Sequence, residues 1–209
     1  MSAGVFITLE GGEGAGKSTQ ARLLTEHLAG RGIDVLLTRE PGGSPGSERL
    51  RSLLLSGETD WSPPAEVLLH FAARAEHVEC TIRPALAAGR WVVCDRFSDS
   101  TMAYQGYGQG ADREMIAGLA KMIGLEPDLT LVLDVASEVA QRRLAARGGR
   151  ADRYERMPAG FHDRVRAGFL EIAIADPDRC VLISADGTEV DVQGRIVAAA
   201  GERLGLSRR

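Results

Sequence analysis

The chain has 209 residues, enough for one domain with a sizeable buried core. Hydrophobic residues make up 44% and charged residues 26%, so the composition excludes a disordered or fibrous protein. The net charge is −4, and this acidic balance argues against a surface built to bind nucleic acid. Glycine stands out with 25 residues, which indicates loops whose backbone approaches a ligand or bends sharply.

Short apolar runs alternate along the chain with longer segments of helical spacing. The expected strands are residues 5–9, 35–37, 91–94, 129–133 and 181–183. The expected helices are residues 17–30, 64–88, 137–147 and 190–204. The strands are continuously apolar rather than alternating, as in parallel sheets buried on both faces. The predicted fold class is therefore α/β, a three-layer sandwich in which helices flank a five-stranded parallel sheet.

The cysteines and the distribution of apolar residues bear on where the protein acts in the cell. The three cysteines, Cys80, Cys94 and Cys180, are too few for a disulfide framework or a zinc site, and we expect Cys94 and Cys180 to be buried. We find no signal peptide and no apolar run of about 18 residues. These observations predict a cytoplasmic protein without nucleic-acid or membrane partners. They also predict a single domain over residues 1–209.

The strongest motif lies between the first predicted strand and the first predicted helix. Residues 11–18 read GGEGAGKS and fit the phosphate-loop pattern G-x-x-x-x-G-K-[ST]. The glycines let backbone N–H groups surround phosphate oxygens, and the positive end of the helix adds to them. The residues predicted to bind the triphosphate are Gly11, Gly12, Glu13, Gly14, Ala15, Gly16, Lys17, Ser18 and Thr19. The motif predicts a nucleoside triphosphate but does not identify an acceptor.

The third predicted strand ends in Asp95-Arg96, at the sheet edge where ligands bind in such folds. We predict that Ser18 and Asp95 hold Mg²⁺, the cofactor that accompanies ATP. Glu10 either joins the outer shell of the metal or merely caps the loop. Arg96 has the fork geometry to grip an acceptor phosphate.

An arginine- and glycine-rich stretch at about residues 147–156 predicts a short lid over the triphosphate. Its arginines, Arg147, Arg150 and Arg153, would stabilise charge on the transferring group. No general base is evident, and an anionic acceptor needs none. The predicted catalytic residues are therefore Lys17, Arg96 and an arginine of this lid, all acting by charge and orientation.

Four stretches of the chain resemble bacterial thymidylate kinases. They are LEGGEGAGKST at 9–19, TREPGG at 38–43, DRF at 95–97 and STMAYQG at 100–106. The phosphate loop is common to many families, but the second and fourth stretches are far more specific. The resemblance implies transfer of the γ-phosphoryl group of ATP to thymidine monophosphate (dTMP), with Mg²⁺. It also implies a P-loop nucleotide kinase fold and a homodimer formed through helices that flank the sheet.

The resemblance assigns acceptor-binding roles by position. It implies that Arg96 binds the dTMP phosphate, assisted by Arg51 rather than Arg49. It implies that Arg74 hydrogen-bonds a thymine carbonyl, which disfavours the amino group of cytosine. The remaining implied contacts are Thr101 at the base edge, Tyr104 and Gln105 along the deoxyribose, and Glu13 near the 3′-hydroxyl.

Two further comparisons with the family matter. The phosphate loop lacks the arginine that one branch uses at the γ-phosphate, so Arg153 is expected to act there instead. The family usually has a phenylalanine four residues before the base-binding arginine, but this chain has His70. A shift of one residue turns a helical side chain by about 100°, so Phe71 cannot simply substitute. We predict that His70 stacks on the base, with Phe71 behind it.

Alternatives remain at this stage. The nearest is another P-loop nucleotide or small-metabolite kinase. A nucleotide-hydrolysing switch or a non-catalytic binding module is less favoured. The apolar residues of the 64–88 segment fit a dimer face or the core equally well: Val67, Leu68, Phe71, Val78 and Ile82. Residues 184–188 are placed to meet adenine, with Arg142 or Arg143 stacking on it.

Overall fold

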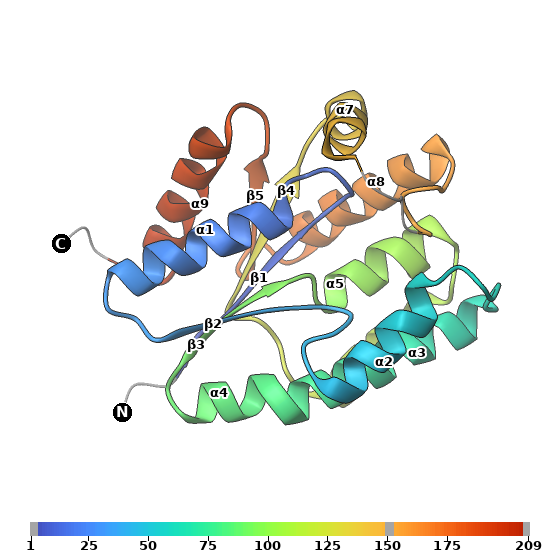
Figure 1. Cartoon of the computed structure of the whole chain (residues 1–209), viewed down its shortest axis with the longest axis horizontal. Helices are drawn as coiled ribbons and strands as arrows, with labels where there is room; N and C mark the ends of the chain where they lie inside the picture. Colours follow the sequence, from blue (N-terminus) through green and yellow to red (C-terminus); the bar gives the residue numbers. More distant parts are fainter. Residues whose placement is uncertain (1–3, 149–152, 207–209) are drawn as a thin grey trace.

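The computed structural model describes residues 4–148 and 153–206. Its centre is a five-stranded sheet in the order β2-β3-β1-β4-β5, with every neighbouring pair parallel (Figure 1). The strands are β1 (Phe6–Gly11), β2 (Val35–Arg39), β3 (Trp91–Asp95), β4 (Leu129–Asp134) and β5 (Cys180–Ser184). The predicted α/β fold with five parallel strands is confirmed, and each strand lies within two residues of its predicted bounds.

Helices cover both faces of the sheet (Figure 1). On one face, α1 (Lys17–Gly30) and α9 (Glu189–Arg203) bury leucine and isoleucine side chains against Ile7 and Leu9 of β1. The other face carries α3 (Pro63–His77), α4 (Arg83–Ala87), α5 (Ser98–Thr101) and α8 (Ala159–Ala175). There Phe6 packs with Val78, Ile82 and Phe97. Successive β1 side chains point to opposite faces, so one apolar strand serves two cores.

The predicted 64–88 helix is continuous but not uniform. Between α3 and α4 the chain forms a wider, π-helical segment, η1 (Val78–Ile82). Pro84 lies two residues after this segment. Proline has no N–H, and its ring would clash with the carbonyl four residues earlier in a regular helix, so a widened turn accommodates it. Of the five apolar residues left open above, Leu68 is 50% exposed and the others are buried in the core.

The remaining elements are α2 (Pro45–Leu55), the π-helical segment η2 (Met102–Gly108), α6 (Arg113–Ile123) and α7 (Ser137–Arg147). The Ser44 side chain accepts a hydrogen bond from Ser47 N and starts α2. Thr188 and Asp191 form a capping box that starts α9. These caps hold the loops after β2 and β5 at the carboxyl end of the sheet.

Two composition-based expectations can be compared with the structure. Cys94 and Cys180 are buried and Cys80 is exposed, and all three are free thiols. Among the described residues, no helix has the length and apolarity needed to cross a bilayer.

Candidate active site

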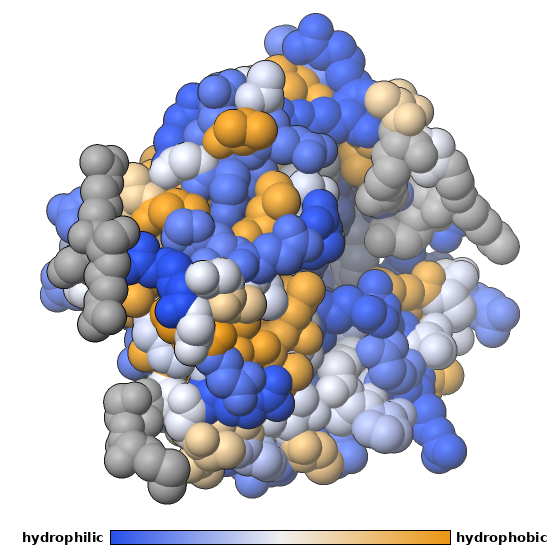
Figure 2. Space-filling view, turned by 60° about the vertical axis from the view of Figure 1, so that its left-hand side comes forward, coloured by the Kyte–Doolittle hydropathy of each residue, from blue (hydrophilic) through white to orange (hydrophobic). Residues whose placement is uncertain are grey.

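A cavity of about 800 Å³ lies at the carboxyl end of the sheet. Its walls come from the loop after β1, the end of β2, α2, α3, η2, α7 and the start of α9. Figure 2 shows a hollow to the right of centre with mainly hydrophilic side chains on its rim. Its size and its convergent charges make this cavity the candidate active site.

The phosphate loop forms one wall of the cavity from Glu13 to Thr19. Gly14 has φ of +71°, and a Cβ there would lie 2.5 Å from the Ala140 carbonyl oxygen. Only glycine fits that close approach to α7. Lys17 begins α1 and its Nζ donates to the Gly12 carbonyl oxygen at 2.7 Å. The N-terminal end of α1 and the Lys17 ammonium group thus lie together at this loop.

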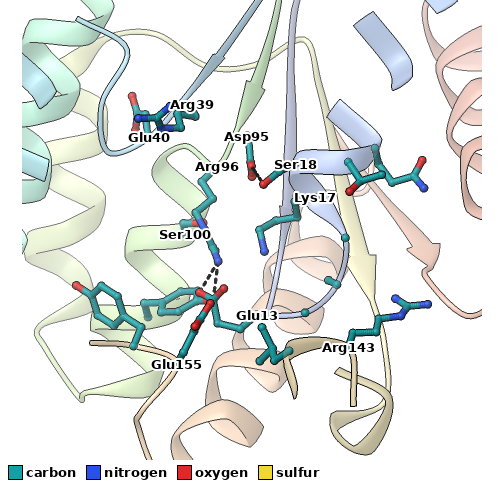
Figure 3. Close-up of a pocket in the computed structure, with 18 of the residues that line it drawn as sticks. Glu13, Lys17, Ser18, Arg39, Glu40, Asp95, Arg96, Ser100, Arg143 and Glu155 are labelled. Carbon is teal, nitrogen blue, oxygen red and sulfur yellow. Dashed lines mark hydrogen bonds and ion pairs between the residues drawn. The ribbon is translucent and has the colours of Figure 1, made fainter. Parts of the chain in front are cut away.

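Ser18 and Asp95 meet beside this loop, as Figure 3 shows. The Ser18 hydroxyl donates to Asp95 Oδ2 at 2.5 Å. Asp95 Oδ1 is buried and has no hydrogen-bond partner among the described residues. A buried carboxylate oxygen without a donor calls for a ligand, and hydroxyl and carboxylate oxygens suit Mg²⁺. These two residues therefore fit the predicted metal.

Glu10 lies deeper, at the end of β1. Its Oε1 accepts from Phe97 N at 2.7 Å, and its Oε2 accepts from the Ser100 hydroxyl at 2.5 Å. Burial, together with the nearby charge of Asp99, raises the pKa of Glu10 to about 7. With both oxygens occupied, Glu10 caps the turn that leads into α5 rather than the phosphate loop.

Arg96 stands at the centre of the charge network. Its backbone is left-handed, with φ of +71°, and its N–H donates to the Leu9 carbonyl oxygen at 3.0 Å. Its guanidinium donates to Glu13 Oε1 at 2.6 Å and to the Tyr104 hydroxyl at 3.0 Å. In Figure 3, Arg96 and Lys17 point the same way, toward Glu13. Non-glycine residues hold this conformation only where the surroundings enforce it, and such strain clusters at functional sites.

The charged groups around Arg96 shift one another's pKa values. Burial alone would raise the pKa of Glu13, but the positive charges of Arg96 and Lys17 hold it at about 2. Burial, and then the charge of Arg96, lowers the pKa of Lys17 to about 8. The two cations, Arg96 and Lys17, thus share this pocket with the carboxylates of Glu13 and Asp95, and either cation can pair with a phosphate.

Arg74 anchors another wall of the cavity from α3. Its Nε donates to Glu40 Oε2 at 2.8 Å, and its Nη2 donates to the Phe97 carbonyl oxygen and to Thr101 Oγ1. Its Nη1 is buried with no hydrogen-bond partner among the described residues. Glu40 Oε1 also accepts from His77 Nδ1 at 3.0 Å, so the carboxylate that holds Arg74 is itself fixed. One guanidinium nitrogen is therefore left for a ligand.

His70 lies one helical turn before Arg74 and also lines the cavity. Its Nε2 lies 2.9 Å from the Tyr154 hydroxyl, and burial lowers its pKa to about 3, so the ring is neutral. Phe71 packs away in a cluster with Val67 and Ile116. Tyr104 and Gln105 are buried cavity residues as well. Stacking of His70 on a base stays a prediction.

The predicted lid falls partly outside the described residues, which include neither Arg150 nor the Arg147 side chain. Arg153 is described, and its Nη1 forms an ion pair with Glu66 Oε2 at 2.7 Å. Arg51 lines the cavity and donates to the Pro41 carbonyl oxygen at 2.6 Å. Arg49 is exposed. Arg143 lines the cavity together with Gly187 and Thr188, which belong to the stretch predicted to meet adenine.

Comparison with known proteins agrees with this geometry. The sequence profile of the thymidylate kinase family matches residues 9–196. The chain is 55% identical to a thymidylate kinase of Gluconobacter oxydans, over 96% of each chain. It is 53% identical to one from Caulobacter vibrioides, over 99% of this chain and 100% of that one.

The chain belongs to the thymidylate kinase family.

A solved structure agrees: the crystal structure of thymidylate kinase from Ehrlichia chaffeensis has a TM-score of 0.79 and 35% identity, covering 95% of this chain and 99% of that one. Two buried carboxylates of this thymidylate kinase family member are absent from the predicted site. Glu40 lies inside the TREPGG stretch, so its place in a family motif could have marked it as a site residue. Glu66 had no such signal, because its partners are distant in sequence.

Proposed function

We propose that the chain transfers the γ-phosphoryl group of ATP to the phosphate of dTMP, releasing ADP and dTDP. An oxygen of the dTMP phosphate attacks the γ-phosphorus as the bond to the β-phosphate oxygen breaks. One observation carries the proposal. Two buried polar atoms without partners in the described structure, Arg74 Nη1 and Asp95 Oδ1, line the same cavity as the phosphate loop.

The donor half would bind the triphosphate through the residues from Gly11 to Thr19. Ser18 and Asp95 would hold Mg²⁺, which when bound neutralises charge on the phosphates. Lys17 would lie against the β- and γ-phosphates. Its pKa of about 8 would rise on binding because the phosphate charge favours the ammonium form.

The acceptor half would place the dTMP phosphate on Arg96, with Arg51 assisting. Arg96 would then exchange part of its bond to Glu13 for the phosphate, which frees Glu13 for the 3′-hydroxyl. Tyr104 packs edge-to-face against Phe161 and Phe169, so its ring is fixed where it would face the sugar. Gln105 lies beside it in η2.

Base choice would depend on α3. The free Nη1 of Arg74 donates and cannot accept, so it selects a carbonyl and rejects an amino group. Thr101 Oγ1 accepts from Arg74 Nη2 at 3.1 Å, and its hydroxyl proton would remain for the base edge. His70 would stack on the ring. Arg153 would reach the transferring phosphoryl group from the lid at about residues 147–156.

The wider setting is also proposed. A single domain over residues 1–209 would act as a cytoplasmic homodimer, bound to neither nucleic acid nor membrane. Leu53, Leu68 and Met122 are exposed on α2, α3 and α6, and α3 contacts both other helices. Sedimentation velocity of wild type and Leu68→Glu would test the dimer, because a charge in the interface should produce monomers.

The decisive test of function is a coupled assay with ATP, Mg²⁺ and a panel of nucleoside monophosphates. We expect dTMP to have the highest kcat/KM, with dUMP next because it keeps both ring carbonyls, and dCMP at least about 100-fold lower. Equal activity with AMP or GMP would favour another nucleotide kinase. ADP release at an equal rate without any acceptor would favour a hydrolytic switch.

A further inference from the structure

One face of α3 carries three buried polar side chains at intervals of one helical turn. They are Glu66, His70 and Arg74, with exposed fractions of 1%, 8% and 3%. Residues four apart lie on the same helical face. Arg74 and His70 face the cavity, and Glu66 continues their row toward the N-terminal end of α3. The function above gives roles to the first two and none to Glu66.

Glu66 gathers four partners from two other parts of the chain. Its Oε1 accepts from Gln105 Nε2 and Gln109 Nε2 at 2.9 Å each, and from the Tyr154 hydroxyl at 2.8 Å. Its Oε2 pairs with Arg153 at 2.7 Å. Burial would raise the pKa of Glu66, but these hydrogen bonds and the Arg153 charge hold it below its ordinary value. The carboxylate is therefore ionised at neutral pH.

Tyr154 links Glu66 to the cavity. Its hydroxyl contacts Glu66, Gln105 and His70 within 3.1 Å, and its ring is buried against Tyr104. The chain next to Arg153 is therefore held by residues of the acceptor wall. The two oxygens of Glu66 therefore have different partners: Oε1 accepts the hydrogen bonds of the acceptor wall, and Oε2 pairs with the Arg153 guanidinium.

We infer that Glu66 is a positioning residue, which orients Arg153 for phosphoryl transfer by tying it to the helix that binds the acceptor base. This inference rests on the proposed function. It assigns Glu66 no contact with substrate. Its effect on turnover passes through Arg153, while its hydrogen bonds to Gln105 and Tyr154 keep the acceptor wall in register.

Glu66→Gln separates these two tasks. A glutamine keeps one oxygen for the three donors that meet at Oε1, but its amide nitrogen cannot accept from Arg153. Misplacement of a charged group by about 1 Å costs up to about 100-fold in rate. We expect kcat to fall about 10- to 100-fold, with the KM for dTMP changed by less than about 3-fold. Glu76→Gln, an exposed glutamate on the same helix, is the matched control and should behave as wild type.

A double-mutant cycle provides the critical readout. If Glu66 acts through Arg153, Glu66→Gln/Arg153→Gln should be no slower than Arg153→Gln alone. Additive losses in kcat, or a raised dTMP KM with kcat unchanged, would overturn the inference. Glu66→Asp keeps the charge on a shorter side chain and should recover part of kcat, and it replaces Glu66→Gln in the cycle if that variant does not fold.

The controls distinguish the two levels of failure. A wild-type chain that does not phosphorylate dTMP would refute the proposed function itself. A wild-type chain that phosphorylates dTMP, combined with an Arg153→Gln variant of unchanged kcat, would refute the roles of Arg153 and Glu66 and leave the overall reaction standing, since Arg153 would then have no catalytic effect for Glu66 to transmit.

Discussion

The two proposed halves of the cavity, one for the phosphate donor and one for the acceptor, are built by different means. The donor half is one continuous loop, residues 11–19, made largely of backbone groups and of glycines that permit close approach. The acceptor half is assembled from side chains on α2, α3, α5 and η2, with Tyr154 completing it. Backbone groups bind a phosphate chain common to many nucleotides, whereas side-chain networks discriminate one base from another. Substitutions in the two halves should therefore fail in different ways.

The largest effect is expected at Lys17, the one charged side chain that the donor loop contributes to phosphoryl transfer. Lys17→Ala should lower kcat by at least about 1000-fold, because it removes a charge that stabilises the transferring group. The variant should still fold. Burial lowers the pKa of Lys17 to about 8, which means that the charged ammonium group destabilises the folded state and its removal should not unfold the chain. Steady-state kinetics and thermal unfolding check both points.

The exposed Lys121 provides the matched control, and Lys121→Ala should leave kcat unchanged. A Lys17→Ala variant that keeps more than about a tenth of wild-type kcat would contradict the assignment.

Arg74 tests the acceptor half. Arg74→Lys keeps a positive charge beside Glu40 but loses the planar fork and its free Nη1. A hydrogen bond to a charged group contributes about 1.5–3 kcal/mol, so the KM for dTMP should rise roughly 10- to 100-fold. The KM for ATP should change little, which separates the two halves of the cavity.

Arg22→Lys, in an exposed ion pair on α1, is the corresponding control. Equal increases in the KM for ATP and for dTMP would mean that Arg74 supports the whole cavity rather than the base.

Gly14 tests the backbone character of the donor half. Gly14→Ala adds a Cβ at 2.5 Å from the Ala140 carbonyl oxygen, at a φ of +71°. We expect the free energy of unfolding to fall by about 1–3 kcal/mol and the KM for ATP to rise, since the loop must shift away from α7. Chemical denaturation and initial-rate kinetics measure the two effects.

A matched glycine lies in α6. No atom lies within 4 Å of a Cβ built at Gly118, so Gly118→Ala should be neutral or stabilise the helix by up to about 1 kcal/mol. Equal stability losses at both positions would show that close approach to α7 is not the cause.

The smallest effect at neutral pH concerns His70, because its contribution to stability changes only in acid. Its pKa is about 3 in the fold and about 6.5 when unfolded, so between these values the unfolded chain binds a proton that the folded chain does not. Stability from a neutral His70 is therefore present above pH 6.5 and lost as the pH falls toward 3, by at most about 1.4 kcal/mol per pH unit. His70→Phe should reduce the slope of unfolding free energy against pH in that window.

The pKa of Glu13 is lowered to about 2, so its contribution to the stability of the fold is also lost in acid. That loss occurs in both the wild type and His70→Phe, so the difference between their slopes isolates His70. Identical slopes would count against a buried neutral His70. Separately, His70→Ala should raise the KM for dTMP if the imidazole stacks on the base.

The sequence predicted more of one half of the site than of the other. The loop from Gly11 to Thr19 is local, so a motif and its flanking strand and helix were enough to place it. In the acceptor half, Arg96 was predicted from its place after the third strand, and the other residues were identified only through resemblance to a family. Even then, the buried carboxylates Glu40 and Glu66 were missed, because each bonds partners at least 34 residues away.

The amino-acid sequence by itself determined the fold class, the five strands and the phosphate loop, because apolar periodicity and a contiguous glycine motif are local properties of the chain. Only the tertiary structure decided which charges meet. It placed Arg153 on Glu66, buried Val67 and Phe71 in the core, and turned both oxygens of Glu10 toward a cap. Such pairings arise when distant elements pack together, and the energies that select them depend on burial and distance, which no spacing along the chain records.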